Sequence, residues 1–289
     1  MNERDARLSN ADFNRLRALI YRESGISLNS DKKTMLEMRI NPRLLDLGIS
    51  SYAEYCDYVF TLQGRAEELV NLIDAATTNK TSFFREANHF NFLVAKALPE
   101  ITARRSFRRN TLIWSAGCST GEEAYTLAMV LSQYERNRPD FQFSVLATDI
   151  CTAVLDKARR GIFDSQLVDP VPKDLRLRYF MRSRDRTSDS LRAVPELRAR
   201  IEFRHLNLMD ADYSLIEPPS VIFCRNVIIY FDRATQFRIL EKLCRLLAPG
   251  GYFFAGHSES FQGMDLPLVR AGAAVYRKAE LADARDEAV

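Results

Sequence analysis

The sequence has little of the chemistry that marks secreted, metal-binding or membrane-inserted proteins. Its five cysteines are odd in number, widely spaced and without a C-x-x-C pair, which argues against a disulfide framework and a cysteine-based zinc site. The three histidines form no H-E-x-x-H motif and lie near no cysteine pair, so we expect no metal centre. No apolar run approaches the roughly 18–20 residues that span a bilayer, so we expect no membrane insertion.

The sequence also has no large excess of positive or negative charge. The formal net charge is +3, which is too small to indicate nucleic-acid binding over the whole chain. The first seven residues carry charges of both signs and no apolar stretch, so we expect no signal peptide and, with reduced cysteines, a cytoplasmic protein. Apolar residues make up 46% of the 289 residues, enough for one large domain or two modest ones.

Residues 1–78 have the pattern of a small all-helical domain. Apolar residues recur at helical spacing between capping residues and glycines. The expected helices run from Ser9 to Gly25, from Asp31 to Gly48, over 52–62 and over 65–76. Pro42 lies inside the second helix, where we expect a kink or a weak turn, and Gly64 separates the last two.

From residue 111 onward, strands alternate with helices. The expected strands are 111–116, 143–148, 201–206, 221–224, 252–256 and an antiparallel pair at 268–270 and 274–277, and the expected helices are 122–134, 152–160 and 233–247. Such alternation predicts an α/β, doubly wound, Rossmann-like parallel sheet that is covered on both faces. Residues 161–200 interrupt it with the pattern of a β-hairpin, so we expect a small antiparallel β-insertion at about 175–204.

The predicted domain organisation has four parts. They are a helical domain at 1–78, an interdomain segment at 79–110, an α/β domain at 111–279 that contains the insertion, and a frayed tail at 280–289. The interdomain segment includes Phe83, Phe84 and Arg85 in succession. A simple linker has little reason to carry such a run, so we expect this segment to contribute to a site.

Small and acidic residues follow the first two strands of the predicted sheet. The loop from Ala116 to Glu123 resembles a G-x-G-x-x-G motif, but Ser119 occupies one glycine position. Its small residues would let a ligand approach the backbone. The alternative is a tight turn between strand and helix that binds no ligand. Asp149 ends the next strand and can accept both hydroxyls of a ribose. The alternative for Asp149 is an N-cap for the helix at Thr152.

Two further strand ends carry polar residues. Asn207-Leu208 follows a strand of alternating pattern at 201–206, and Arg225-Asn226 follows an apolar strand at 221–224. Because asparagine is common in such turns, Asn207 alone indicates little. Arg225 and Asn226 are harder to explain as a turn, so we expect a ring of ligand contacts at the carboxyl ends of the strands.

Five segments together resemble the CheR family of chemotaxis receptor methyltransferases. They are NKTSFFRE at 79–86, STGEE at 119–123, ATDI at 147–150, FCRNVIIYF at 223–231 and FAGHSES at 254–260. The resemblance runs from about residue 10 to about residue 278. It implies an S-adenosylmethionine-dependent methyltransferase that converts glutamate side chains of bacterial chemoreceptors into methyl esters and releases S-adenosylhomocysteine.

The resemblance also implies a set of site residues. Those expected to bind the cofactor are Asn79, Thr81, Arg85, Glu123, Asp149, Asn207, Leu208, Arg225 and Asn226. Glu122 remains an alternative to Glu123. Arg85 and Tyr230 are expected beside the transferred methyl, with a core aromatic as the alternative for Tyr230.

The expected partners are the cytoplasmic methylation helices of membrane chemoreceptors. By resemblance, a basic helix of the N-terminal domain docks on them, and the candidate residues are Lys32, Lys33, Arg39 and Arg43. Pro42 and Leu45 stand where further arginines are usual, and a solvated helix face is the alternative. In some members the β-insertion binds a C-terminal receptor pentapeptide, but the loop at 183–190 lacks the expected glycines.

The chemistry needs no general base. A glutamate with a pKa of about 4.3 is ionised at pH 7, so the enzyme has to align the carboxylate with the methyl group and exclude water. A nucleic-acid methyltransferase would be expected to carry an Asp/Asn-Pro-Pro-aromatic run where this chain has Arg225-Asn226-Val227. A receptor-binding adaptor would need no cofactor, which makes cofactor binding the discriminating measurement.

Overall fold

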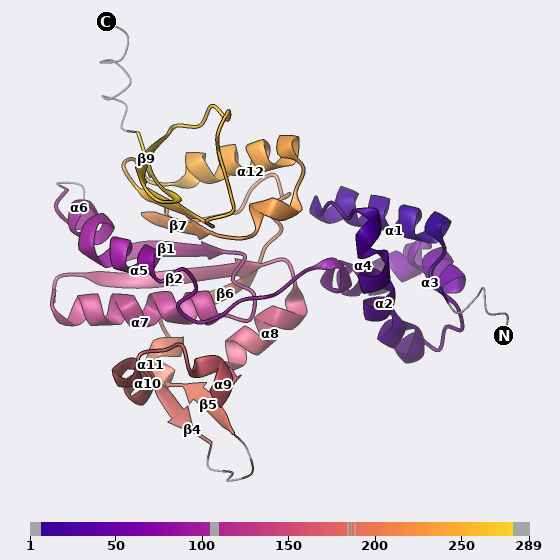
Figure 1. The fold of residues 1–289 in the computed structure, drawn as a ribbon, viewed down its shortest axis with the longest axis horizontal. Helices are drawn as coiled ribbons and strands as arrows, with labels where there is room; N and C mark the ends of the chain where they lie inside the picture. The colour runs from indigo at the N-terminus through magenta and orange to yellow at the C-terminus, as the bar shows by residue number, and fades with distance from the viewer. Residues whose placement is uncertain (1–6, 105–109, 184, 186, 188, 280–289) are drawn as a thin grey trace, which may run out of the picture.

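The structure is a computed structural model that describes residues 7–104, 110–183, 185, 187 and 189–279. The tail predicted at 280–289 lies outside the described residues. A helical domain stands beside one end of a larger α/β domain, from which a small sheet projects (Figure 1). This arrangement confirms the predicted fold class.

The helical domain packs around a core of its own. Its elements are α1 (Asn10–Ser24), η1 (Ser30–Lys32), α2 (Lys33–Leu47), α3 (Tyr52–Val59) and α4 (Leu62–Ala76). The core includes Leu16, Ile20, Leu36, Ile40, Tyr55 and Leu72, all fully buried. The hydroxyl of Ser9 accepts from the backbone N–H of Asp12 and so caps α1.

One local prediction for this domain needs correction. Helix α2 contains Pro42 and ends at Leu47, before Gly48, as predicted. The break predicted at Gly64 lies earlier, because the Thr61 hydroxyl accepts from the Gly64 N–H at 2.9 Å and starts α4 at Leu62. Gly64 is therefore inside the helix, where a Cβ atom would lie 2.0 Å from the carbonyl oxygen of Tyr58.

The α/β domain is built on a sheet with the order β6-β2-β1-β7-β8-β10-β9 in the described residues. The strands are β1 (Asn110–Ala116), β2 (Gln142–Asp149), β6 (Ile201–His205), β7 (Val221–Cys224), β8 (Tyr252–Ala255), β9 (Leu268–Gly272) and β10 (Val275–Lys278). Strands β6, β2, β1, β7 and β8 are parallel, and β10 joins β8 and β9 antiparallel. The parallel strands therefore end together beside the helical domain (Figure 1).

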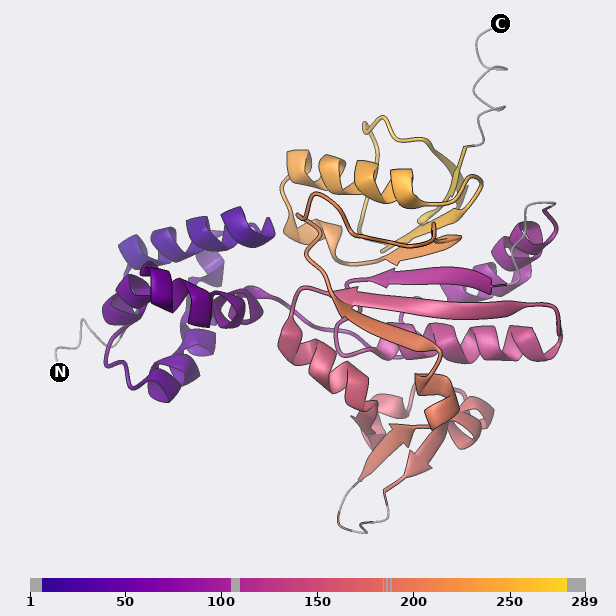
Figure 2. The same ribbon diagram turned by 180° about the vertical axis from the view of Figure 1, so that it is seen from behind.

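Both faces of this sheet are covered by helices. One face packs on α5 (Asn88–Phe92), η2 (Leu93–Ala97), α6 (Leu98–Thr102), α7 (Glu122–Arg136) and α8 (Thr152–Arg160), and the other on α12 (Arg233–Leu246). Figure 2 shows the same layers from behind. The segment predicted to join the domains thus supplies a helical stretch that covers the sheet, with Phe90 and Leu93 buried.

The insertion is larger than predicted and starts earlier. It consists of β3 (Ile162–Asp164), α9 (Ser165–Val168), α10 (Lys173–Tyr179), β4 (Phe180–Arg182), β5 (Ser190–Ala193) and α11 (Pro195–Arg198). The predicted hairpin is β4 and β5, but β3 pairs with β5 on the other side. A three-residue strand is too short for periodicity to reveal. Strand β6 belongs to the main sheet, so the insertion ends before Ile201.

Two further findings concern the described part of the chain. No described helix has the length and apolarity needed to cross a membrane. All five cysteines lie within the described residues and are buried free thiols. The short 3-10 helix η3 (Ile228–Tyr230) follows β7.

Candidate functional site

A cleft of about 950 Å³, which includes the part open to solvent, lies where the helical domain meets the carboxyl ends of the parallel strands. Every cofactor and catalytic residue predicted from the sequence borders it: Asn79, Thr81, Arg85, Glu123, Asp149, Asn207, Leu208, Arg225, Asn226 and Tyr230. Parallel strands bring their ends to one edge, which explains why residues far apart in sequence meet there.

The loop after β1 needs its glycine for packing. Gly117 has a φ of +86°, and a Cβ atom there would lie 2.3 Å from Cγ2 of Val227. The N–H groups of Gly117 and Cys118 donate to the carbonyl oxygen of Thr148, at 2.7 and 2.9 Å. The loop therefore turns tightly between β2 and the loop after β7, and it also borders the cleft.

Asp149 is held at the tip of β2 by backbone donors. Its Oδ2 accepts from the Ser119 N–H at 2.8 Å, and its Oδ1 from the Cys151 N–H at 2.9 Å. Burial raises the pKa of Asp149, while these hydrogen bonds lower it. A carboxylate has about four lone-pair sites, so both oxygens retain acceptor capacity toward the cleft.

The alternative of an N-cap role for Asp149 is wrong, because Asp74 of α4 fills that place. The Asp74 carboxylate accepts from the N–H groups of Thr152 and Ala153, both at 3.2 Å, and from the Thr152 hydroxyl at 3.0 Å. The helical domain therefore caps α8, next to the cleft. Sequence analysis missed Asp74, since no local pattern connects it with Thr152.

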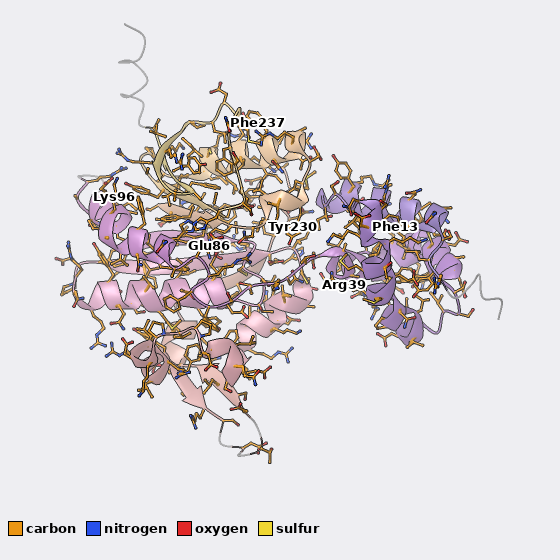
Figure 3. The ribbon with its side chains drawn as sticks, viewed as in Figure 1. Phe13, Arg39, Glu86, Lys96, Tyr230 and Phe237 are labelled. Carbon is orange, nitrogen blue, oxygen red and sulfur yellow. The ribbon has the colours of Figure 1, made fainter. Side chains whose placement is uncertain are left out.

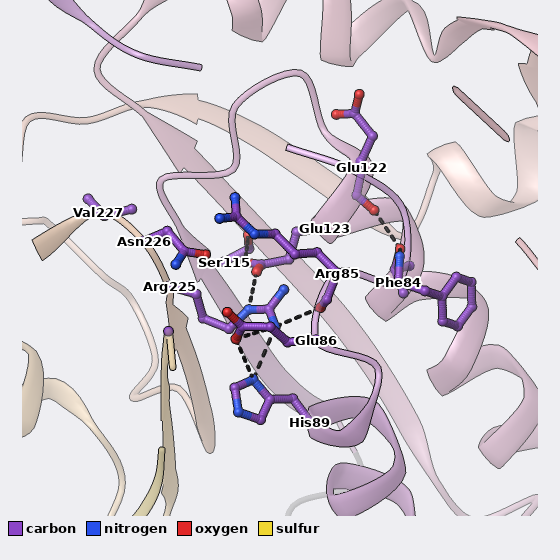
Figure 4. A network of polar contacts seen from close by, with 12 residues as sticks. Phe84, Arg85, Glu86, His89, Ser115, Glu122, Glu123, Arg225, Asn226 and Val227 are labelled. Carbon is purple, nitrogen blue, oxygen red and sulfur yellow. Dashed lines mark hydrogen bonds and ion pairs between the residues drawn. The ribbon is translucent and has the colours of Figure 1, made fainter. Parts of the chain in front are cut away.

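Glu123 and Arg225 form a buried pair at the base of the cleft (Figure 4). Glu123 Oε2 accepts from Arg225 Nε at 2.7 Å, and Glu123 Oε1 from the Ser115 hydroxyl at 2.7 Å. Arg225 Nη1 donates to the carbonyl oxygen of Arg85 at 2.8 Å. Because Arg225 is 6% exposed, its guanidinium chiefly joins three segments of the chain. Glu122 instead accepts from the Thr120 hydroxyl and does not border the cleft in the described residues.

His89 completes this network. Burial and the neighbouring charge of Arg225 lower the pKa of His89 to about 4. The neutral ring is assigned from its partners: Nδ1 accepts from Arg225 Nη1 at 3.0 Å, and Nε2 faces the carbonyl oxygen of Ala273 at 3.3 Å. Glu86, His89 and His257 lie close enough to hold a metal ion. Both ring nitrogens of His89 are engaged, however, and the adjacent guanidinium would repel a cation.

Aromatic side chains fix the segment that carries Arg85. Phe83 is 1% exposed and packs edge-on against Phe163, with ring centroids 4.9 Å apart. Phe84 and Glu86 both have positive φ, +53° and +56°, so the backbone turns sharply around Arg85. Nη1 of Arg85 donates to the carbonyl oxygen of Lys80 at 3.0 Å. The aromatic run predicted to be more than a linker thus anchors Arg85 at the cleft.

Tyr230 is half-buried on the side of the α/β domain that faces the helical domain (Figure 3). Its carbonyl oxygen accepts from the Ser27 N–H at 2.9 Å, and Asn207 Nδ2 donates to the carbonyl oxygen of Glu23 at 2.6 Å. A core role for Tyr230 is therefore wrong. Ser24 and Ile26 line the cleft from the helical domain, and no sequence motif indicated either residue.

The basic residues of α2 lie in different surroundings. Arg43 forms a fork with Glu68, with N–O distances of 2.7 and 2.8 Å, and this pairing raises the pKa of Arg43. Arg39 donates to the carbonyl oxygens of Ala75 and Thr77 at the end of α4. Both guanidinium groups are therefore committed to contacts within the helical domain. Lys32 is exposed.

Comparisons with known proteins agree with the geometry. A family model described as "CheR methyltransferase, SAM binding domain" matches residues 79–276, and one described as "CheR methyltransferase, all-alpha domain" matches residues 11–77. "Chemotaxis protein methyltransferase 2" of Pseudomonas aeruginosa is 40% identical over 268 residues, 93% of each chain. "Chemotaxis protein methyltransferase" of Escherichia coli is 40% identical over 96% of this chain and 93% of its own. The chain belongs to the CheR methyltransferase family and is an S-adenosylmethionine-dependent methyltransferase.

Proposed function

We propose that this chemotaxis methyltransferase holds S-adenosylmethionine in the cleft and presents a receptor glutamate to its methyl group beside Arg85 and Tyr230. The observation that supports this proposal is the convergence of Asp149, Arg85 and Tyr230 on one cleft from three separate segments. The product is a glutamate methyl ester of a chemoreceptor, as used in chemotactic adaptation.

The residues of the cleft fit the cofactor. S-adenosylmethionine carries a ribose diol, an ammonium group, a sulfonium centre and an apolar adenine face. Asp149 retains lone pairs for hydroxyl groups, and Glu123 lines the cleft beside it, paired with Arg225. Leu206, Leu208 and Val227 supply apolar surface. Asn79, Thr81, Asn207, Arg225 and Asn226 are proposed to complete the binding site.

The bound cofactor supplies an electrophilic methyl group, and the chain's own residues orient the acceptor. A glutamate carboxylate is ionised at neutral pH, so no residue has to remove a proton. We assign to Arg85 the pairing and orientation of this carboxylate, because a guanidinium can hold both carboxylate oxygens. Tyr230 can face the sulfonium with its hydroxyl or with its ring, and the cation–π attraction of a ring is about 0.5–2 kcal/mol. Ser24 and Ile26 line the cleft from the helical domain, and their role in this proposal is to shield the reacting groups from water.

Receptor recognition is proposed to use the surfaces on either side of the cleft. The cytoplasmic methylation helices would contact the helical domain near Lys32 and Lys33, while Arg39 and Arg43 would act indirectly by holding α2 in place. A receptor's C-terminal pentapeptide is proposed to bind the insertion. Strands β3 and β4 form the open edges of its sheet, and an open edge can pair with an extended peptide.

Methyl transfer to receptor membranes tests the function. Purified protein, receptor-containing membranes and S-adenosylmethionine with a labelled methyl group should give labelled receptor. Alkali should release the label as methanol, because esters hydrolyse under conditions that leave N-methyl groups intact. Alkali-stable label would contradict glutamate methylation. Failure to bind the cofactor in calorimetry, together with no methyl transfer, would favour the adaptor alternative.

A further inference from the structure

The carboxylate of Glu259 gathers backbone N–H groups from the loop that carries Asn226. Glu259 Oε1 accepts from Val227 and Ile228, at 3.0 and 2.8 Å. Its Oε2 accepts from Asn226 at 3.0 Å and from Gly256 at 2.6 Å. Glu259 is 7% exposed. A buried carboxylate therefore occupies a nest of backbone donors directly beneath the loop after β7.

This loop has an uncommon backbone conformation. Asn226 has a φ of +59°, in the left-handed region that glycine and, less often, asparagine and aspartate adopt. The end of β8 approaches it closely, since a Cβ atom at Gly256 would lie 2.6 Å from Asn226 Nδ2 and 2.9 Å from its backbone nitrogen. Burial raises the pKa of Glu259, and the backbone hydrogen bonds lower it. These donors thus stabilise the ionised form that the loop requires.

Tyr230 depends on the same support. Three of the four N–H groups bound by Glu259 belong to the residues that lead into the turn η3, and the Tyr230 N–H donates to the carbonyl oxygen of Val227 at 3.2 Å. Asn226 and Val227 also lie beside the Arg225 network (Figure 4). A shift of these N–H groups would therefore move Tyr230 relative to Arg85.

We propose that Glu259 is a positioning residue for methyl transfer, which acts by setting the place of Asn226 and Tyr230 in the cleft. This inference rests on the role proposed above for Tyr230. It gives the FAGHSES segment at 254–260 a physical role. Gly256 allows this segment to lie close to Asn226, and Glu259 supplies the carboxylate that accepts from the backbone N–H groups of the loop.

Glu259→Gln tests the charge at nearly constant volume. The Gln amide would place its NH2 group against backbone donors, so the loop should move. We expect kcat at saturating cofactor to fall about ten- to a hundredfold, with the receptor KM changed less than about threefold. Glu259→Asp keeps the charge and should retain more kcat. The control is Glu100→Gln. This variant removes a carboxylate of α6 that accepts a hydrogen bond from the Tyr252 hydroxyl, and it should leave kcat unchanged.

Chemical rescue separates positioning from general stability. Glu259→Ala removes atoms that correspond to acetate and leaves the N–H nest empty. Added acetate, but not chloride at equal ionic strength, should restore kcat severalfold in this variant and leave wild type and Glu100→Gln unchanged. If Glu259→Ala does not fold, the order of kcat, wild type above Asp above Gln, carries the test.

Three outcomes would overturn the proposal. They are a wild-type kcat for Glu259→Gln, equal losses for the Asp and Gln variants, and a folded Glu259→Ala that acetate does not rescue. Tyr230→Phe, which removes the hydroxyl, and Tyr230→Leu, which removes the ring, are assayed in parallel. A wild-type kcat for both would overturn the role of Tyr230, whereas a slow Tyr230 variant with a normal Glu259→Gln would overturn only the role of Glu259.

Discussion

Charged side chains meet different surroundings at the carboxyl edge of the main sheet and on helix α2. At the sheet edge, backbone N–H groups hold Asp149 and leave lone pairs toward the cleft. On α2, each of the three guanidinium nitrogens of Arg43 donates to Glu68 or Asp46. The difference teaches that backbone donors hold a carboxylate and leave it acceptor capacity for a ligand, whereas the fork with Glu68 directs the Arg43 guanidinium into its own domain.

Arg43→Glu tests this comparison most strongly. Glu68, with a side chain 1% exposed, would lose its partner and face a like charge. The helical domain should lose about 3–5 kcal/mol of stability, which denaturant unfolding of the full chain measures. Lys32→Glu, at an exposed position, is the control and should change the free energy of unfolding by less than about 0.5 kcal/mol. If Arg43→Glu changed the free energy of unfolding as little as Lys32→Glu, Arg43 would be free to contact a receptor.

His89 should make the free energy of unfolding depend on pH. Its pKa is about 4 in the folded protein and about 6.5 in an unfolded chain. As pH falls below about 6.5, the unfolded chain takes up this proton first, so stability falls toward pH 4 by up to about 3 kcal/mol. The free energy of unfolding, measured across this pH range, should change less with pH in His89→Gln than in the wild type. An unchanged slope in that variant would contradict the prediction.

Asp149→Ala should weaken S-adenosylmethionine binding. Loss of a charge-assisted acceptor costs roughly 1.5–3 kcal/mol, or about ten- to a hundredfold in affinity, and titration calorimetry measures it. Asp156→Ala, in an exposed ion pair on the same side of the sheet, provides the control. Wild-type affinity in Asp149→Ala would remove Asp149 from the cofactor site.

Arg85→Ala and Tyr230→Phe should slow methyl transfer while the fold persists. We expect each to lower kcat about tenfold, and the assay uses saturating cofactor because Arg85→Ala also affects cofactor binding. Arg136→Ala, at the exposed end of α7, should leave kcat unchanged. If both cleft variants methylate receptor at the wild-type rate, the proposed active site is wrong.

The smallest expected effect concerns docking. Lys32→Glu with Lys33→Glu should raise the receptor KM severalfold at low salt, because the proposed partner is a glutamate-bearing helix that basic side chains would attract. Added salt should weaken the wild type more than the variant, since the Debye length is about 8 Å at physiological ionic strength. An unchanged receptor KM at low salt would make this end of α2 a solvated surface.

Most of the fold and the cleft could be predicted because their signals are local. Strand β7 and helix α8 lie where periodicity placed them, and residues after parallel strands must meet at one edge. Strand β3 was missed because three residues show no period. Asp74 and His89 were missed because their roles depend on partners that no motif connects with them.

The sequence by itself determined the two-part architecture, the strand ends that form the cleft and the family to which the chain belongs. These follow from periodicity and motifs, which neighbouring residues encode. Only the tertiary structure decided which charges are free: Arg43 pairs with Glu68 25 positions away, Asn226 is held by Glu259 33 positions away, and Arg225 pairs with Glu123 102 positions away. The physical reason is that an ionised group takes its role from the groups that pair with it or leave it exposed, and folding brings those groups from distant parts of the chain.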